Sequence, residues 1–414
     1  MVLKSTAGPS PSILEEITSG GVTAPLGFKA AAAAAGIRYP DRLDLALIYS
    51  EVAATAAGVY TCNRVQAAPV QVTQDNLTDG QARAVVVNAG IANAATGAQG
   101  LDDAREMTRI TARVLDINPD EVAVASTGVI GLLLPIERIE KGIIAAANGL
   151  SRNGGTQAAQ AILTTDTRPK EIAVRISLGE KSVTIGGMAK GSGMIHPCMA
   201  TMLGFITTDA AITSEALRLA LQRSTDRSFN LVTVDGDTST NDMVVVLANG
   251  LAGNPLITID SPELKEFQTA LDYVNQYLAR EIARDGEGAS RLIEVRVKNA
   301  PSLLDAQKAA RAVAGSSLVK TAVFGRDPNW GRILAAVGYS GAEFAPEQIA
   351  IWLGEVLVAQ EGVETAFNED EAREALDRET VLITVDLGVG TAEATAWGCD
   401  LTFDYIKINA SYRS

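Results

Sequence analysis

The chain has 414 residues, a net charge of −14 and a hydrophobic fraction of 47%. The acidic balance argues against a nucleic-acid partner or an anionic membrane, because both need a basic footprint. Cys62, Cys198 and Cys399 are far apart in the sequence, so they form neither a disulfide framework nor a zinc pattern. The single histidine, His196, excludes every multi-histidine metal site.

The termini and the hydropathy predict a location and a number of domains. Segment 1–14 has no apolar stretch of the signal-peptide kind. No run approaches the ~20 apolar residues of a membrane span. We therefore expect a reducing, cytoplasmic setting. At roughly 150 residues per domain, the length predicts two or three domains.

Short runs rich in β-branched and apolar residues predict strands along the whole chain. In chain order these runs are 43–49, 83–87, 121–125, 172–176, 183–185, 202–207, 231–234, 244–247, 292–297, 321–324 and 381–385. The segment 171–185 is typical of a hairpin that turns at Gly179–Glu180.

Helical spacing of apolar residues predicts helices between some of these strands. One helix covers 104–115 and stops before Pro119, and others begin at Thr213 and at Leu303. Two further helices carry capping signals. Ser261 is the expected cap of a long helix with Pro262 in its first turn, and Asn368 caps a helix whose first turn is acidic.

Strands and helices are mixed, but they do not alternate strictly. Adjacent strands without a crossover favour antiparallel sheets with helices on their faces, a layered α/β or α+β fold. A doubly wound order is the less favoured alternative. The composition near Gly286–Ser290 indicates a domain boundary after the long helix.

Two loop-like segments match known binding motifs only in part. Segment 186–193 looks like a phosphate-binding loop, but Ser192 stands where that motif needs lysine, so a tight turn is the better interpretation. Segment 235–242 looks like a calcium loop, but Thr240 replaces the required glycine. We interpret it as a polar loop or a turn that faces a substrate.

The segment 195–203 contains the remaining candidates for nucleophilic chemistry. Cys198 and His196 are only two positions apart, whereas a catalytic cysteine and histidine normally come from distant segments. Thr201 by itself is typical of a strand threonine. Its functional interpretation depends on the residues around it.

Several segments together resemble the ornithine acetyltransferase/N-acetylglutamate synthase family. They occur in the family's order from about residue 20 to the C-terminus, at 126–131, 164–167, 187–203, 234–242, 285–289, 325–333 and 408–410. Each match alone is weak, but the set is specific. The chain departs from the family pattern at 88–97, at Cys198 and at Ser414, which bears on fine specificity.

The resemblance implies that the chain cleaves itself between Ala200 and Thr201 into segments 1–200 and 201–414. The Thr201 hydroxyl attacks the Ala200 carbonyl, and water opens the resulting ester. The new α-amine of Thr201 has a reference pKa of ~7.7–8.0, so it can act as a general base near neutral pH. One residue then supplies both the nucleophile and the base.

The reaction implied is a ping-pong acetyl transfer in arginine biosynthesis. Thr201 takes the acetyl group from N2-acetylornithine and passes it to glutamate. Thr127 and Gly128 are the implied oxyanion hole. No metal or cofactor is implied, and acetyl-CoA is expected as a further acetyl donor; a monofunctional member would use N-acetylornithine alone.

The resemblance also implies a set of substrate contacts: Thr167, Lys190, Thr201, Glu287, Asn409 and Ser414. From charge alone, we expect Lys190 to bind an α-carboxylate. We expect Glu287 to meet the side-chain ammonium of N-acetylornithine. The alternative interpretation of both residues is a solvated surface charge.

The implied fold is a sandwich of two sheets between helix layers over 1–286, with a smaller C-terminal α+β domain over 287–414. The two cleaved chains are expected to stay together and to pair into a heterotetramer or larger assembly. Two alternatives stay open at this point. One is a self-cleaving amidase or aminopeptidase of the same architecture, and the other is a non-catalytic binding protein on this scaffold.

Overall fold

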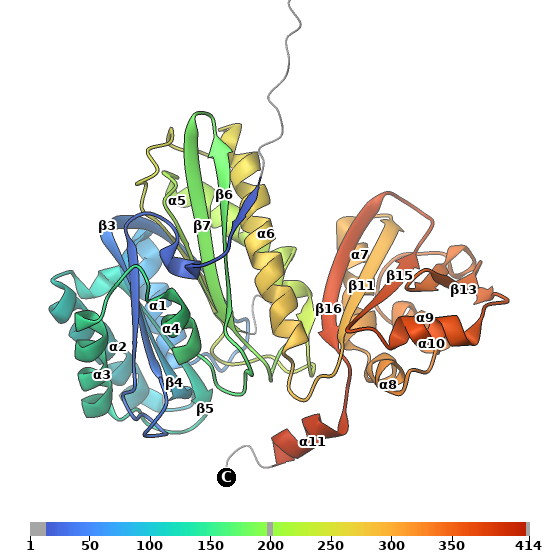
Figure 1. Cartoon of the computed structure of the whole chain (residues 1–414), viewed down its shortest axis with the longest axis horizontal. Coiled ribbons are helices and arrows are strands. Elements are labelled where there is room, and N and C mark those ends of the chain that lie inside the picture. The colour runs from blue at the N-terminus through green and yellow to red at the C-terminus, as the bar shows by residue number, and fades with distance from the viewer. Residues whose placement is uncertain (1–13, 197–201, 411–414) are drawn as a thin grey trace, which may run out of the picture.

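The structure is a computed structural model that describes residues 14–196 and 202–410. The predicted cleavage point Ala200–Thr201, Cys198 and the terminal Ser414 lie outside these residues. Figure 1 shows two bodies, a larger one that holds the earlier part of the chain and a smaller one built from the C-terminal part. No helix of the described ranges is long and apolar enough to cross a membrane.

The larger body contains a nine-stranded sheet within the described ranges. Its order is β1-β6-β7-β8-β10-β3-β4-β5, with β2 paired to β3. The strands are β1 (Glu15–Ile17), β2 (Phe28–Ala33), β3 (Leu45–Tyr60), β4 (Gln81–Ile91), β5 (Val122–Val129), β6 (Lys170–Leu178), β7 (Lys181–Lys190), β8 (Leu203–Thr208) and β10 (Met243–Ala248).

The 16-residue strand β3 joins two halves of this sheet. Its first part, Leu45–Tyr49, pairs with β4, whereas Thr55–Tyr60 pairs with β10, and the register shifts between Tyr49 and Ala54. An apolar cluster joins side chains of β3, β4 and β5 to side chains of β7, β8 and β10. The two halves therefore pack face to face, which confirms the predicted two-sheet sandwich.

Helices cover the outer faces of the sandwich. On one side lie α2 (Gly97–Leu115) and α3 (Ile136–Asn148), which share an apolar cluster with β3, β4 and β5. On the other side lie α5 (Ser214–Asp226) and α6 (Glu263–Arg284), which pack on β6, β7 and β10. The shorter helices α1 (Ala68–Asn76) and α4 (Gly155–Ala161) complete the sandwich.

The smaller body contains a seven-stranded sheet among the described residues, in the order β14-β13-β12-β15-β11-β16-β9. Its strands are β9 (Val232–Thr233), β11 (Leu292–Ala300), β12 (Ala350–Leu353), β13 (Val356–Gln360), β14 (Val363–Glu364), β15 (Thr380–Asp386) and β16 (Ala392–Cys399). Its helices are α7 (Leu303–Gly315), α8 (Ser317–Gly325), α9 (Trp330–Gly338), α10 (Glu369–Leu376) and α11 (Phe403–Ala410).

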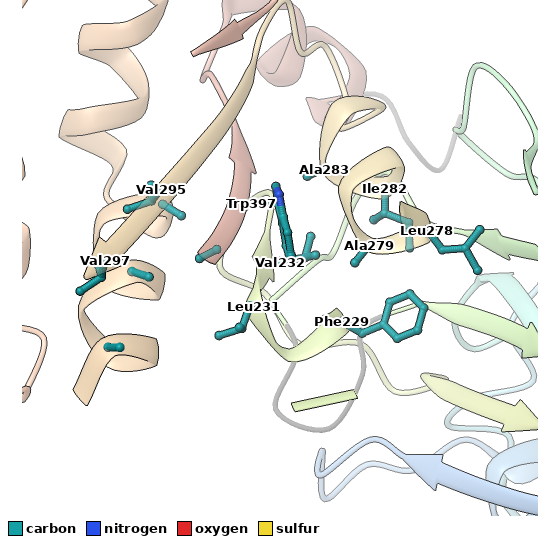
Figure 2. Close-up of a cluster of buried hydrophobic side chains, with 14 of the residues drawn as sticks. Phe229, Leu231, Val232, Leu278, Ala279, Ile282, Ala283, Val295, Val297 and Trp397 are labelled. Carbon is teal, nitrogen blue, oxygen red and sulfur yellow. The ribbon is translucent and has the colours of Figure 1, made fainter. Parts of the chain in front are cut away.

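Buried apolar side chains join the two bodies. Figure 2 shows Leu278 and Ile282 of α6 in one cluster with Val232 of β9, Val295 of β11 and Trp397 of β16. Strand β9 precedes the predicted boundary after residue 286, yet it pairs with β16 of the second sheet. The division of the chain at 286/287 stays a prediction.

Most of the predicted elements are present, including the hairpin of β6 and β7 and the helices that begin after Thr213 and Asn368. The strand predicted at 321–324 is wrong. These residues lie in α8, which Ser316 caps by accepting a hydrogen bond from the Val319 amide. A strong cap and burial of Val319 and Val323 outweigh the β-propensity of the short run.

Three finer predictions also need correction. The long helix α6 begins one residue later than predicted, because the Ser261 hydroxyl accepts from the Thr258 amide and does not cap the helix. The sheets are mixed, since β4–β5 and β8–β10 pair in parallel. Gly186 lies in β7 and not in a tight turn; its missing side chain lets the Gly21 carbonyl approach closely.

Candidate active site

One cavity of about 490 Å³ brings together residues from distant parts of the chain. Five residues implied by the family resemblance line it: Thr127, Gly128, Lys190, Glu287 and Asn409. Met202, which directly follows Thr201 in the chain, lines it as well. Thr167 is not among the lining residues, although its neighbours Thr164 and Thr165 are.

The end of β5 supplies Thr127 and Gly128 to the cavity wall. Gly128 has φ +130°, and a Cβ at this position would lie 2.2 Å from the carbonyl carbon of Gly90 on β4. Only glycine fits here without moving the backbone. The amide of Asn241 donates to the Ser126 carbonyl at 2.8 Å, which fixes the chain directly before Thr127.

Lys190 ends β7 and reaches the cavity from a buried network of charges. Its ammonium donates to the Thr164 hydroxyl at 2.8 Å and lies 3.6 Å from the Asp166 carboxylate. Asp166 also accepts from Lys170 at 2.8 Å and from the Gly191 amide at 2.7 Å. Burial alone would raise the pKa of Asp166, but Lys190 and Lys170 hold it far below its usual range. Asp166 is therefore a carboxylate that fixes Lys190.

Thr167 belongs to the same network, behind the cavity wall. Its amide donates to Asp285 at 3.0 Å, and its hydroxyl donates to the same carboxylate. Asp285 also accepts from Lys170 at 2.6 Å. Lys170, whose side chain is fully buried, thus bridges the carboxylate that holds Thr167 and the carboxylate that holds Lys190.

Glu287 also lines the cavity and is buried directly after α6. Its amide donates to the Ser192 carbonyl at 3.0 Å, and its carboxylate accepts from the Asn409 amide at 2.8 Å. A Cβ on Gly193 would lie 2.4 Å from the Glu287 carboxyl group. Glycine at this position therefore leaves room for Glu287, and α11 supplies its partner.

Asp242 is a cavity residue that the sequence analysis did not single out. It is 2% exposed, it lines the cavity, and its Oδ2 atom has no hydrogen-bond partner in residues 14–196 and 202–410. Burial raises the pKa of its carboxyl group well above the usual value. The predicted polar loop 235–242 does face the cavity, through Ser239, Thr240, Asn241 and Asp242.

His196 lies outside the cavity lining, with Nδ1 3.0 Å from the Thr233 hydroxyl. Burial, followed by the charge of Arg311, lowers its pKa to about 4, so the ring is neutral near pH 7. Of the cysteines in the described part, Cys62 is exposed and Cys399 is buried. No group of three or more His, Cys, Asp and Glu side chains in that part could hold a metal ion.

Comparison with known proteins places the chain in a family. The model of the ArgJ family matches residues 29–414. The arginine biosynthesis bifunctional protein ArgJ of Symbiobacterium thermophilum is 59% identical over 401 residues, which cover 96% of this chain and all of that protein. The protein of the same name from Caldanaerobacter subterraneus is 50% identical over 403 residues, with the same coverage of both chains.

A search of the solved structures found a similar protein. Ornithine acetyltransferase of Mycobacterium tuberculosis, determined with ornithine, is 42% identical, with a TM-score of 0.43 over 45% of this chain and all of that one. The family model and the curated relatives cover nearly the whole chain described above. The expected family is thereby confirmed: the chain belongs to the ArgJ family of arginine biosynthesis proteins.

Proposed function

We propose that this cavity transfers an acetyl group from N2-acetylornithine to glutamate through an acetyl ester on Thr201. One observation carries the proposal. A cavity of amino-acid size combines a buried cation, Lys190, a buried anion, Glu287, and the Thr127–Gly128 turn, all beside the residue that follows Thr201. Both substrates are amino acids with charged groups at two ends, so opposite charges in one cavity suit them.

The proposed reaction has two acyl-transfer steps. The Thr201 hydroxyl attacks the acetamide carbonyl of N-acetylornithine, and its proton passes through the Thr201 α-amine to the departing ornithine amine. The glutamate amine then attacks the acetyl ester, which releases N-acetylglutamate and restores the hydroxyl. Both steps form a tetrahedral oxyanion, for which Thr127 and Gly128 are the proposed donors; losing one such donor costs about 10²–10³ in rate.

Charge assigns the substrate contacts. The proposed partner of the α-carboxylate is Lys190, because the buried Asp166 fixes its ammonium at the cavity wall. The proposed partner of the ornithine side-chain ammonium is Glu287, which Asn409 orients through its amide. Thr167 lies with Asp285 behind the wall, so its proposed contribution to binding is to hold the segment that carries Thr164 and Thr165.

Self-cleavage must precede this reaction. We propose that Thr201 attacks the Ala200 carbonyl and that the two chains, 1–200 and 201–414, then stay together. Strands β7 and β8 support this, because they belong to different chains after cleavage and yet pair over six positions. A cytoplasmic heterotetramer or larger assembly that needs no cofactor completes the proposal, with Ser414 as a further substrate contact.

The test combines the mass of the denatured protein with a transfer assay. Wild type should give two chains divided at Ala200–Thr201, and the Thr201→Ala variant should stay whole. The wild-type protein should then move acetyl from N-acetylornithine to glutamate, and the variant should not. A single wild-type chain, or release of free acetate with no glutamate dependence, contradicts the proposal; the second result would support an amidase of the same architecture.

A further inference from the structure

A second cavity of about 240 Å³ adjoins the acetyl-transfer cavity. The two cavities share Gly128, Thr164 and Thr165 in their linings. The second cavity is lined further by Arg38 and Arg42. Both cavities therefore border the proposed oxyanion hole, the first with Lys190 and Glu287 and the second with the arginines.

Two paired glycines line the second cavity, and one of them, Gly128, also lines the first. Gly90 and Gly128 are paired on β4 and β5, and both have positive φ angles, +101° and +130°. A Cβ on Gly90 would lie 3.1 Å from the Cβ of Arg38. The side chain of Arg38 thus starts within van der Waals reach of the strand pair that carries the proposed oxyanion hole.

The second cavity is cationic. The Arg38 guanidinium lies 5.2 Å from the centre of the Tyr39 ring, and it forms no ion pair within the described ranges. Arg42 donates to the Leu163 and Thr164 carbonyls at 2.5 and 3.1 Å. These bonds use some of its hydrogen-bond donors, but neutral carbonyl groups do not neutralise its positive charge. Arginine presents a planar fork of donors that matches phosphate and carboxylate groups.

The acid in this cavity, Asp44, does not neutralise the arginines. Its two oxygens accept from the Ala35 and Ile37 amides at 2.7 and 2.6 Å. Burial outweighs these hydrogen bonds and the nearby Arg42, and it raises the pKa of the Asp44 carboxyl group. The cavity therefore carries two cationic groups and one buried acid whose oxygens are already occupied.

Size indicates what kind of ligand needs both cavities. The first cavity of about 490 Å³ lies within the ~300–1,000 Å³ that encloses a small ligand, so it holds an acetylated amino acid by itself. A neighbouring cationic cavity serves a longer donor that keeps its acyl group near Gly128 and carries anionic groups some distance away. Acetyl-CoA has this form, with a thioester at one end and phosphates at the other.

We propose that the second cavity binds the phosphate-bearing arm of acetyl-CoA, with Arg38 as its main phosphate contact. This inference rests on the proposed function, because it places a second donor at the same Thr201. Half-exposed Tyr39 is the surface on which the adenine ring stacks. Ile408 of α11 also lines this cavity.

The added step uses no further reactant. The Thr201 oxygen forms a bond to the thioester carbonyl carbon, the carbon–sulfur bond breaks, and coenzyme A leaves as the thiol with the proton of the Thr201 hydroxyl. The acetyl ester is the same as that formed from N-acetylornithine. Glutamate then takes the acetyl group, so only the donor half-reaction depends on the second cavity.

The test compares the two donors in the Arg38→Glu variant of the full cleaved protein. We expect its KM for acetyl-CoA to rise about tenfold or more, because a charge-assisted contact is replaced by repulsion. Transfer from N-acetylornithine to glutamate should stay within about twofold of wild type. Arg38→Lys should recover part of the acetyl-CoA affinity. The control Arg373→Ala, on exposed α10, should change neither the KM for acetyl-CoA nor the transfer from N-acetylornithine.

Coenzyme A itself gives a second readout. It should inhibit transfer from N-acetylornithine in wild type, and Arg38→Glu should need about tenfold more of it for the same inhibition. The inference is overturned if the variant and wild type need equal concentrations of coenzyme A for the same inhibition. It is also overturned if wild type transfers acetyl from N-acetylornithine but does not use acetyl-CoA. A higher KM for glutamate with both donors overturns it too, and assigns the arginines to the acceptor's carboxylate. If the wild-type protein does not transfer acetyl from N-acetylornithine to glutamate, the result contradicts the proposed function.

Discussion

Lys190 and Glu287 line the same cavity with opposite charges, but the protein holds them in different ways. Lys190 is anchored to a buried network in which Lys170 donates hydrogen bonds to both Asp166 and Asp285, and Asp166 lies 3.6 Å from the Lys190 ammonium. Among the described residues, the Glu287 side chain has one hydrogen-bond partner, Asn409, on a helix with no buried residues. The part of the cavity lining that carries Lys190, the Lys190 wall, is therefore part of the folded core. The part that carries Glu287, the Glu287 wall, is completed by the exposed helix α11.

This difference separates stability from substrate binding. Removing a member of a buried ion network leaves uncompensated charge in a poorly solvated place, which destabilises the whole fold. Removing a partner at an exposed helix leaves a carboxylate that lines a cavity, where water can take the place of the lost partner, so the fold should tolerate the change. Substitutions on the two walls should consequently affect different measurements.

The largest effect is expected for Lys170→Met, which keeps the length of the side chain and removes its charge. Asp166 and Asp285 would lose the ammonium that lies 2.8 and 2.6 Å from their oxygens. We expect the free energy of unfolding to fall by about 3–5 kcal/mol, measured by denaturant titration. The control is Arg113→Met, which breaks an exposed ion pair of 2.6 Å and should cost less than about 1 kcal/mol. Equal losses of unfolding free energy in the two variants would show that the buried network contributes no more to stability than an exposed ion pair.

Acid should reduce the difference between wild type and Lys170→Met. The pKa of Asp166 in the folded protein lies far below its usual value, because Lys190 and Lys170 outweigh the effect of burial. A depressed pKa contributes stability above the unfolded value of about 3.9, and this contribution is lost as the pH falls toward the folded value. Unfolding free energies measured at pH 7, 5 and 3 should therefore differ less between the two proteins at pH 3. A constant difference would exclude Asp166 as the linked group.

The local parts of the fold were predictable from sequence, and the contacts between distant parts were not. The β6–β7 hairpin, the start of a helix at Thr213 and the cap at Asn368 depend on neighbouring residues, so they are present as predicted. The run 321–324 has strand composition but lies in a helix, because a cap and tertiary packing decide its structure. Composition could not reveal that β3 would join the two halves of the sandwich.

The same limit applies to the site. The family resemblance singled out Lys190 and Glu287, and both line the cavity. It did not single out Lys170, whose importance comes from a contact with Asp285, 115 positions away. Thr167 donates to Asp285 through its amide and its hydroxyl, and its expected contact with substrate stays a prediction. The signal that could have drawn attention to Asp166 and Lys170 is a charged pair four residues apart beside a buried strand.

The smallest effect is expected on the Glu287 wall, from Asn409→Ala. This substitution removes the amide that donates to Glu287 at 2.8 Å, and leaves the backbone bond of Glu287 to Ser192 in place. A net hydrogen bond to a charged group corresponds to roughly a tenfold change in binding, so we expect KM for N-acetylornithine to rise about three- to tenfold. Unfolding free energy should stay unchanged, because Asn409 is exposed on α11. Lys407→Ala removes an exposed ion pair on the same helix and should alter neither quantity. A loss of stability comparable to that of Lys170→Met would mean that α11 belongs to the core after all, and that the two walls are held alike.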